Sequence, residues 1–114
     1  MDYNNDFKYD LSVGQVKEKE LGDILTGAKI EVKYDLRALE TGNVFVEYSS
    51  RGKNSGLSTS TADYYCFCFG DTLHLIKTQD LKARCRRWVG TKRDVVGGDS
   101  NTSKGILLPI NELF

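Results

Sequence analysis

The stretch Ile30-Glu31-Val32-Lys33-Tyr34-Asp35 alternates apolar and charged residues, and Thr41-Gly42-Asn43 separates it from the similar stretch Val44-Phe45-Val46-Glu47-Tyr48. Two alternating segments around a Gly-Asn turn predict a β-hairpin from about Lys29 to Tyr48. Because side chains on a strand repeat every two residues, Glu31, Lys33 and Asp35 share one face of the first strand. Antiparallel pairing would place Glu47 roughly opposite Lys33, so that three carboxylates and one lysine converge on one patch.

Such a cluster is unstable through like-charge repulsion unless a cation or a shared proton relieves it. Oxygen donors suit Mg²⁺, which usually takes one or two carboxylates together with waters and phosphate oxygens. The pattern therefore indicates a metal-dependent nuclease site. The same alternation is also typical of a solvated sheet face with Glu–Lys cross-strand pairs, and periodicity alone favours that second interpretation.

The length of 114 residues suits one domain with a real core, so we expect a single domain over residues 1–114. With 16 basic and 16 acidic residues the formal net charge is zero, so the overall charge by itself does not indicate a polyanion partner. Basic residues nevertheless gather between Lys77 and Arg93, where they can meet phosphates. The chain lacks a long apolar run and a signal-peptide pattern, which predicts a cytoplasmic protein without membrane contact.

A coarse reading along the chain predicts an α/β fold with a mixed, mainly antiparallel sheet flanked by helices. A 3.6-residue apolar period predicts a helix over 14–25. A second hairpin is expected from 64–69 and 72–76 across Gly70-Asp71, followed by a helix over 79–88 with Thr78 as its N-cap. A short strand over 93–96, a loop over 97–105 and an apolar strand from Ile106 complete the prediction.

The chain has three cysteines, and Cys66 and Cys68 lie in the apolar segment Tyr64–Phe69. We expect all three to be free thiols, since two cysteines this close on one strand do not bridge easily. A zinc site built from Cys66, Cys68, His74 and Cys85 is the alternative, although Cys-x-Cys is not the usual zinc spacing.

Residues Gly14-Gln-Val-Lys-Glu18-Lys-Glu20-Leu21 resemble the opening helix of the archaeal Holliday junction resolvases, which belong to the PD-(D/E)xK nuclease superfamily. From about Asp10 to Leu113 the chain is similar to small phage-encoded endonucleases of that superfamily. The phrases that carry this second resemblance are Glu31-Val-Lys33-x-Asp35, Thr41-Gly-Asn43-x-x-x-Glu47, Ser55-Gly56, Ala62-Asp63-Tyr64 and Gly-Gly-Asp-x-Asn-Thr-Ser-Lys104-Gly.

The resemblance implies a restriction-endonuclease-like fold and a phage enzyme in the host cytoplasm that hydrolyses phosphodiester bonds in DNA, branched DNA included. It implies Mg²⁺, or Mn²⁺, held by Glu18, Asp35 and Glu47, with Lys33 and Glu31 as the catalytic residues. Lys33 would orient the attacking water or balance charge on the phosphate. DNA is the expected partner, and a homodimer is left open. The expected DNA contacts are Arg51, Lys53, Arg86 and Arg87.

The match departs from the superfamily pattern in one place, since Ser49 stands two residues after Glu47, where a lysine is expected. A rival register takes Glu31-Val-Lys33 as the Glu-x-Lys motif and Asp23 as its aspartate. Glu20 is likewise an alternative to Glu18 on the predicted helix. The departure leaves open a different function, a noncatalytic DNA-binding or interaction protein with a degraded nuclease site.

Overall fold

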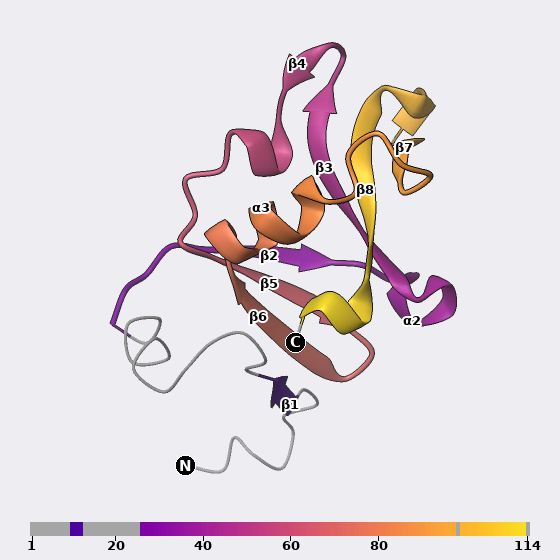
Figure 1. The fold of residues 1–114 in the computed structure, drawn as a ribbon. Coiled ribbons are helices and arrows are strands. Elements are labelled where there is room, and N and C mark those ends of the chain that lie inside the picture. The colour runs from indigo at the N-terminus through magenta and orange to yellow at the C-terminus, as the bar shows by residue number, and fades with distance from the viewer. Residues whose placement is uncertain (1–9, 13–25, 98, 114) are drawn as a thin grey trace.

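The computed structural model describes residues 10–12, 26–97 and 99–113, which form a single α/β domain with two four-stranded sheets (Figure 1). The first sheet has the order β1 (Asp10–Ser12), β6 (Thr72–Lys77), β5 (Tyr64–Phe69) and β2 (Ile30–Tyr34). It is mixed, because β1 and β2 run parallel to their neighbours whereas β5 and β6 are antiparallel. The second sheet is antiparallel, in the order β4 (Lys53–Asn54), β3 (Asn43–Ser50), β8 (Ser103–Pro109) and β7 (Asp94–Gly97).

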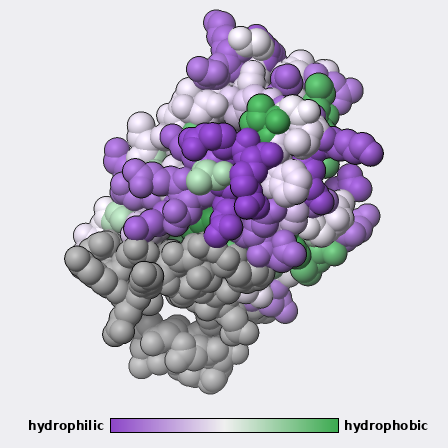
Figure 2. Space-filling model, in the orientation of Figure 1, coloured by the Kyte–Doolittle hydropathy of each residue, from purple (hydrophilic) through white to green (hydrophobic). Residues whose placement is uncertain are grey.

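Helix α3 (Thr78–Arg86) lies across the first sheet in Figure 1, and the shorter α2 (Ala38–Thr41) connects β2 to β3. Three 3₁₀ turns complete the described elements: η2 (Gly56–Ser58), η3 (Asp99–Asn101) and η4 (Ile110–Leu113). The main core joins both sheets and α3, and its fully buried side chains include Val44, Phe67, Ile76, Leu81, Ile106 and Leu108. The view in Figure 2 is mostly hydrophilic, with isolated apolar residues at the surface.

The predicted hairpin of β5 and β6 is confirmed, with Tyr65 opposite Ile76 and Phe67 opposite His74. Gly70 makes the turn with a φ of 58°, a left-handed conformation that glycine adopts without a steric penalty. The strand predicted over 93–96 is also present, as β7. The last strand begins at Ser103 rather than at Ile106, because Ser103 and Lys104 extend the ladder with β7 and β3.

The predicted hairpin from Lys29 to Tyr48 is wrong. After Asp35 the chain turns into α2, and Gly42, with a φ of 76°, caps that helix by donating its N–H to the Ala38 carbonyl (2.7 Å). The Gly-Asn sequence is therefore a helix C-cap and not a hairpin turn. As a result β2 pairs with β5 in one sheet and β3 pairs with β8 in the other, so Glu47 is not opposite Lys33 in a ladder.

The assignment of Thr78 as N-cap is also wrong, since Lys77 is the capping residue and makes no side-chain capping bond. Thr78 is instead the first residue of the helix, and its hydroxyl is buried without a hydrogen-bond partner in the described part of the chain. The predicted helix over 14–25, with Glu18, Glu20 and Asp23, lies outside the described residues. In the described ranges we find no helix long and apolar enough to span a membrane.

Candidate functional site

Lys33 and Glu47 line the same cavity, although their strands belong to different sheets. On the side of β3 away from β8, β4 pairs only with Ser49 and Ser50, and the turn η2 packs against the strand before that point. The cavity has a volume of about 190 Å³. Its remaining lining residues come from β3, η2 and β5: Phe45, Val46, Gly56, Leu57, Tyr65 and Phe67.

The size of this cavity limits what it can hold. A water molecule occupies about 30 Å³ of liquid, whereas pockets for small organic ligands usually have volumes of about 300–1,000 Å³. The cavity therefore suits a few waters, an ion or one phosphate group. Most of its lining is aromatic or aliphatic, and Lys33 and Glu47 are the two charged residues that could contact an ion or a phosphate.

Asp35 reaches the same stretch of β3 from the end of β2. Its Oδ2 accepts a hydrogen bond from the Phe45 N–H (3.2 Å), and its Oδ1 accepts one from the Arg37 N–H (3.1 Å). These bonds fix the Asp35 carboxylate beside β3 and hold the turn into α2. Asp35 thus has a structural role, and it does not line the cavity shared by Lys33 and Glu47.

Glu47 is held by two neighbouring residues whose role the sequence did not reveal. The Ser55 hydroxyl donates to Glu47 Oε2 (2.8 Å). Gly56 follows with a φ of 52°, and a Cβ there would overlap the Glu47 carbonyl group. Only a glycine allows η2 to approach β3 this closely, so Ser55-Gly56 fixes the position of Glu47. Ser55-Gly56 is one of the phrases that carry the family resemblance, but the sequence gives no indication that these residues contact Glu47.

The strand β3 is also anchored on its other side, just after Glu47. A bulge interrupts its ladder with β8 between Glu47 and Ser49, and the Tyr48 hydroxyl donates to Asp94 Oδ1 (2.6 Å). This hydrogen bond, together with burial, raises the pKa of Tyr48 to about 12. Burial alone would raise the pKa of Asp94, but the bonds from Tyr48 and Gly90 outweigh it and hold that pKa below its usual value.

Glu31 and Lys33 form an ion pair on β2, with Nζ and Oε2 3.6 Å apart. Their side chains are 44% and 51% exposed, so solvent screens the pair and it contributes little to stability. The pair places a carboxylate next to Lys33, which also lines the cavity. Of the predicted site residues, the structure thus places Lys33 and Glu47 at one cavity and Glu31 beside Lys33, whereas Asp35 bonds to β3 outside the cavity.

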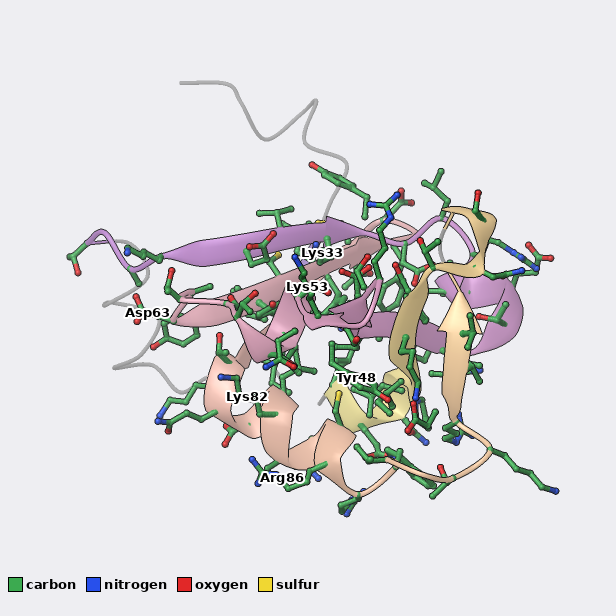
Figure 3. The ribbon with its side chains drawn as sticks, turned by 90° about the horizontal axis from the view of Figure 1, so that it is seen from above. Lys33, Tyr48, Lys53, Asp63, Lys82 and Arg86 are labelled. Carbon is green, nitrogen blue, oxygen red and sulfur yellow. The ribbon has the colours of Figure 1, made fainter. Side chains whose placement is uncertain are left out.

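The predicted DNA-binding residues fall into two groups. Arg51 lies exposed in the turn between β3 and β4, Lys53 is exposed at the start of β4, and Arg86 is exposed on α3. Figure 3 shows Lys33 and Lys53 on one side of the ribbon and Lys82 and Arg86 projecting from α3. Arg87 is ion-paired with Glu112 at 2.7 Å, which makes it less available to a phosphate.

The zinc alternative does not fit the fold. Cys66 and Cys68 pack on the face of β5 that points away from the main core, whereas Cys85 lies in that core. His74 is opposite Phe67 and therefore shares its face, so the four residues are split across the sheet. All three cysteines are free and buried, as predicted. Among the described residues no group of three or more His, Cys, Asp or Glu side chains is placed to hold a metal ion.

Comparison of the chain with known protein families, with curated proteins and with solved structures found no match.

Proposed function

We propose that this protein is a magnesium-dependent DNA endonuclease with a restriction-endonuclease-like site. The observation that carries the proposal is the cavity shared by Lys33 and Glu47, because it unites a lysine and a carboxylate from separate sheets. The chemistry needs both charges, since a carboxylate can hold a cation and an ammonium can stabilise a phosphate.

In this proposal Glu47 offers a carboxylate in the cavity and Asp35 a second one beside β3, outside the cavity lining. Mg²⁺ usually binds through one or two carboxylates, with waters and substrate phosphates completing its shell. Each carboxylate is oriented by hydrogen bonds, from Phe45 and Arg37 for Asp35 and from Ser55 for Glu47. When bound, the ion would polarise the scissile phosphate and lower the pKa of a bound water.

Basic side chains of the protein would supply the contacts to the phosphate groups. Lys33 lines the cavity, where its ammonium can stabilise charge on the phosphate, and Glu31 forms an ion pair with it. Arg51 in the β3–β4 turn and Lys53 at the start of β4 are exposed and can bind the phosphate backbone of DNA. These contacts go to phosphates, so they position DNA without selecting a sequence.

The test compares Glu47→Gln with the wild-type protein on linear duplex and on a four-way junction, with Mg²⁺ and with a chelator. Glu47→Gln should lose cleavage and keep DNA binding, because it removes a charge that repels phosphates and retains an oxygen for the Ser55 hydroxyl. Glu40→Gln, an exposed residue of α2, is the matched control and should cleave normally. Lys33→Ala should lose most cleavage while retaining metal binding.

Asp35→Asn needs a stability measurement beside the activity assay. The carboxylate accepts two backbone N–H bonds, and an amide can accept only through its single oxygen. Loss of cleavage in this variant therefore counts as evidence for metal binding only if the protein remains folded. Wild-type cleavage that persists in Glu47→Gln would overturn the assignment of this site.

A noncatalytic DNA-binding protein is the second candidate. Two observations favour it: Ser49 stands where the superfamily has a lysine, and both oxygens of Asp35 already accept backbone hydrogen bonds. It predicts salt-dependent DNA binding, weakened by Lys53→Ala, with no cleavage by the wild-type protein on either substrate in Mg²⁺ or Mn²⁺.

A further inference from the structure

We propose that the outer edge of β2 pairs with β2 of a second copy of this chain, antiparallel and centred on Val32, to form a symmetric dimer. The strand β2 is the last strand of its sheet, and Figure 1 shows β5 on one side of it and no described strand on the other. An open strand edge is a template for pairing with another strand. The inference uses only the geometry of β2 and does not depend on the nuclease activity.

The backbone groups of β2 are oriented as a two-fold axis through Val32 requires. The Asp35 N–H donates to the Cys68 carbonyl, and the Lys29 carbonyl accepts from the Tyr64 N–H, so the odd-numbered residues direct their backbone groups toward β5. Because these groups alternate along a strand, those of Ile30, Val32 and Tyr34 point to the open edge. Antiparallel pairing centred on Val32 sets Ile30 opposite Tyr34 and Val32 opposite itself, so every outward N–H and C=O finds a partner.

The charged side chains Glu31 and Lys33 also fit a two-fold axis through Val32. In this register Glu31 lies opposite Lys33 of the partner subunit, and Lys33 lies opposite Glu31 of the partner subunit. Both are pairs without backbone hydrogen bonds, in which opposing side chains approach most closely. Opposite charges that face each other across strands stabilise a sheet. A shift by one residue would place Glu31 or Lys33 opposite an apolar side chain, so the charges select the register as well as the orientation.

The apolar side chains favour the same contact. Val32 and Tyr34 are large apolar residues left 47% and 71% exposed on β2, and Leu36 just beyond the strand is 94% exposed. In the dimer Val32 packs on its copy and Tyr34 packs beside Ile30 of the partner subunit. Pairing thus covers apolar surface that the single chain leaves to water. It also places the partner's Glu31 beside Lys33, which lines the cavity described above.

The proposed interface can be tested by reversing the charge of Glu31 or of Lys33. The readout is the mass of the full chain in solution, measured without DNA and Mg²⁺. The wild-type protein should approach twice its monomer mass of 12.8 kDa as its concentration rises. Glu31→Lys and Lys33→Glu should each raise the dissociation constant about tenfold or more, because each replaces two attractive pairs by two repulsive ones. An equimolar mixture of the two variants should restore a dimer, since every pair is then Lys opposite Glu.

The outcome separates pairing at β2 from other causes. Unfolding or a general loss of charge would not be reversed by mixing, so recovery in the mixture supports this interface alone. A wild-type protein that remains monomeric at its highest soluble concentration would overturn the proposal. A dimer that withstands both charge exchanges would also overturn it. Neither result bears on cleavage, which is measured with DNA and metal.

A cysteine placed on the axis provides an independent check. Residues paired through backbone hydrogen bonds across antiparallel strands have Cα atoms about 5.5 Å apart, a separation that a disulfide can span. Val32→Cys should therefore form a covalent dimer on mild oxidation, whereas Tyr34→Cys should not, since it faces Ile30 of the partner subunit. Tyr34 is the more exposed of the two, so equal cross-linking of both variants would indicate random collision and contradict the register.

Discussion

Replacing Gly56 with alanine should move Glu47 and weaken the fold, and Gly52 provides a matched control. Both glycines have a positive φ, 52° and 77° respectively, so alanine at either site costs about 1–2 kcal/mol. At Gly52 a new Cβ would meet nothing within 4 Å, so that cost is the whole effect. At Gly56 the Cβ would overlap the Glu47 carbonyl group, which adds about 1–3 kcal/mol for the forced shift of η2.

Urea unfolding measures the difference between the two variants. With a slope of about 2 kcal/mol per molar urea, an excess of about 2 kcal/mol lowers the midpoint of Gly56→Ala by about 1 M relative to Gly52→Ala. Cleavage and metal binding should fall in Gly56→Ala alone, because displacement of η2 takes Ser55 away from Glu47. Equal midpoints for the two variants would refute the close approach of η2 to β3 and with it the reasoning that Ser55-Gly56 positions Glu47.

Two further predictions concern ionisation and thiol reactivity. The pKa of Tyr48 is raised from 10.0 to about 12, so its hydrogen bond to Asp94 stabilises the fold fully below pH 10 and is lost as the pH rises to about 12. Tyr48→Phe should cost about 1 kcal/mol at neutral pH and should remove this part of the alkaline loss of stability, measured by urea unfolding across that range; an unchanged profile would contradict it. The three cysteines are buried, and burial raises the pKa of both Cys66 and Cys85 to about 12. An alkylating reagent in mildly alkaline buffer should therefore leave the native thiols unmodified and label all of them after unfolding, and rapid labelling of the native protein would show that they are accessible.

Local patterns predicted those elements whose partners lie close in the sequence. The β5–β6 hairpin was predictable because two apolar segments flank Gly70-Asp71, and each strand pairs with the next. The hairpin predicted from β2 and β3 does not form, because the alternation in Ile30–Tyr34 is equally compatible with pairing to another strand, here β5. Local sequence does not specify that β3 pairs with β8, whose residues lie far along the chain.

The cavity joins two of the predicted site residues in a geometry that differs from the predicted one. Lys33 and Glu47 were chosen because they would face each other in a hairpin, and they instead line one cavity from two different sheets. Asp35 was chosen as a metal ligand, and the structure adds a structural role, since its two backbone hydrogen bonds hold the start of α2 beside β3. Such hydrogen bonds depend on the tertiary fold and leave no periodic signal in the sequence.

The proposed function requires that Glu47 bind a divalent ion in the cavity that it shares with Lys33. The most direct test is a titration of the isotope-labelled protein with Mn²⁺, followed by nuclear magnetic resonance, because this paramagnetic ion broadens the amide signals of nearby residues. We predict that Lys33, Phe45, Glu47 and Gly56 broaden first, that excess Mg²⁺ reverses the effect, and that Glu47→Gln abolishes it while Glu40→Gln does not. Broadening that is unchanged in Glu47→Gln, or that begins at residues remote from the cavity, would contradict the claim.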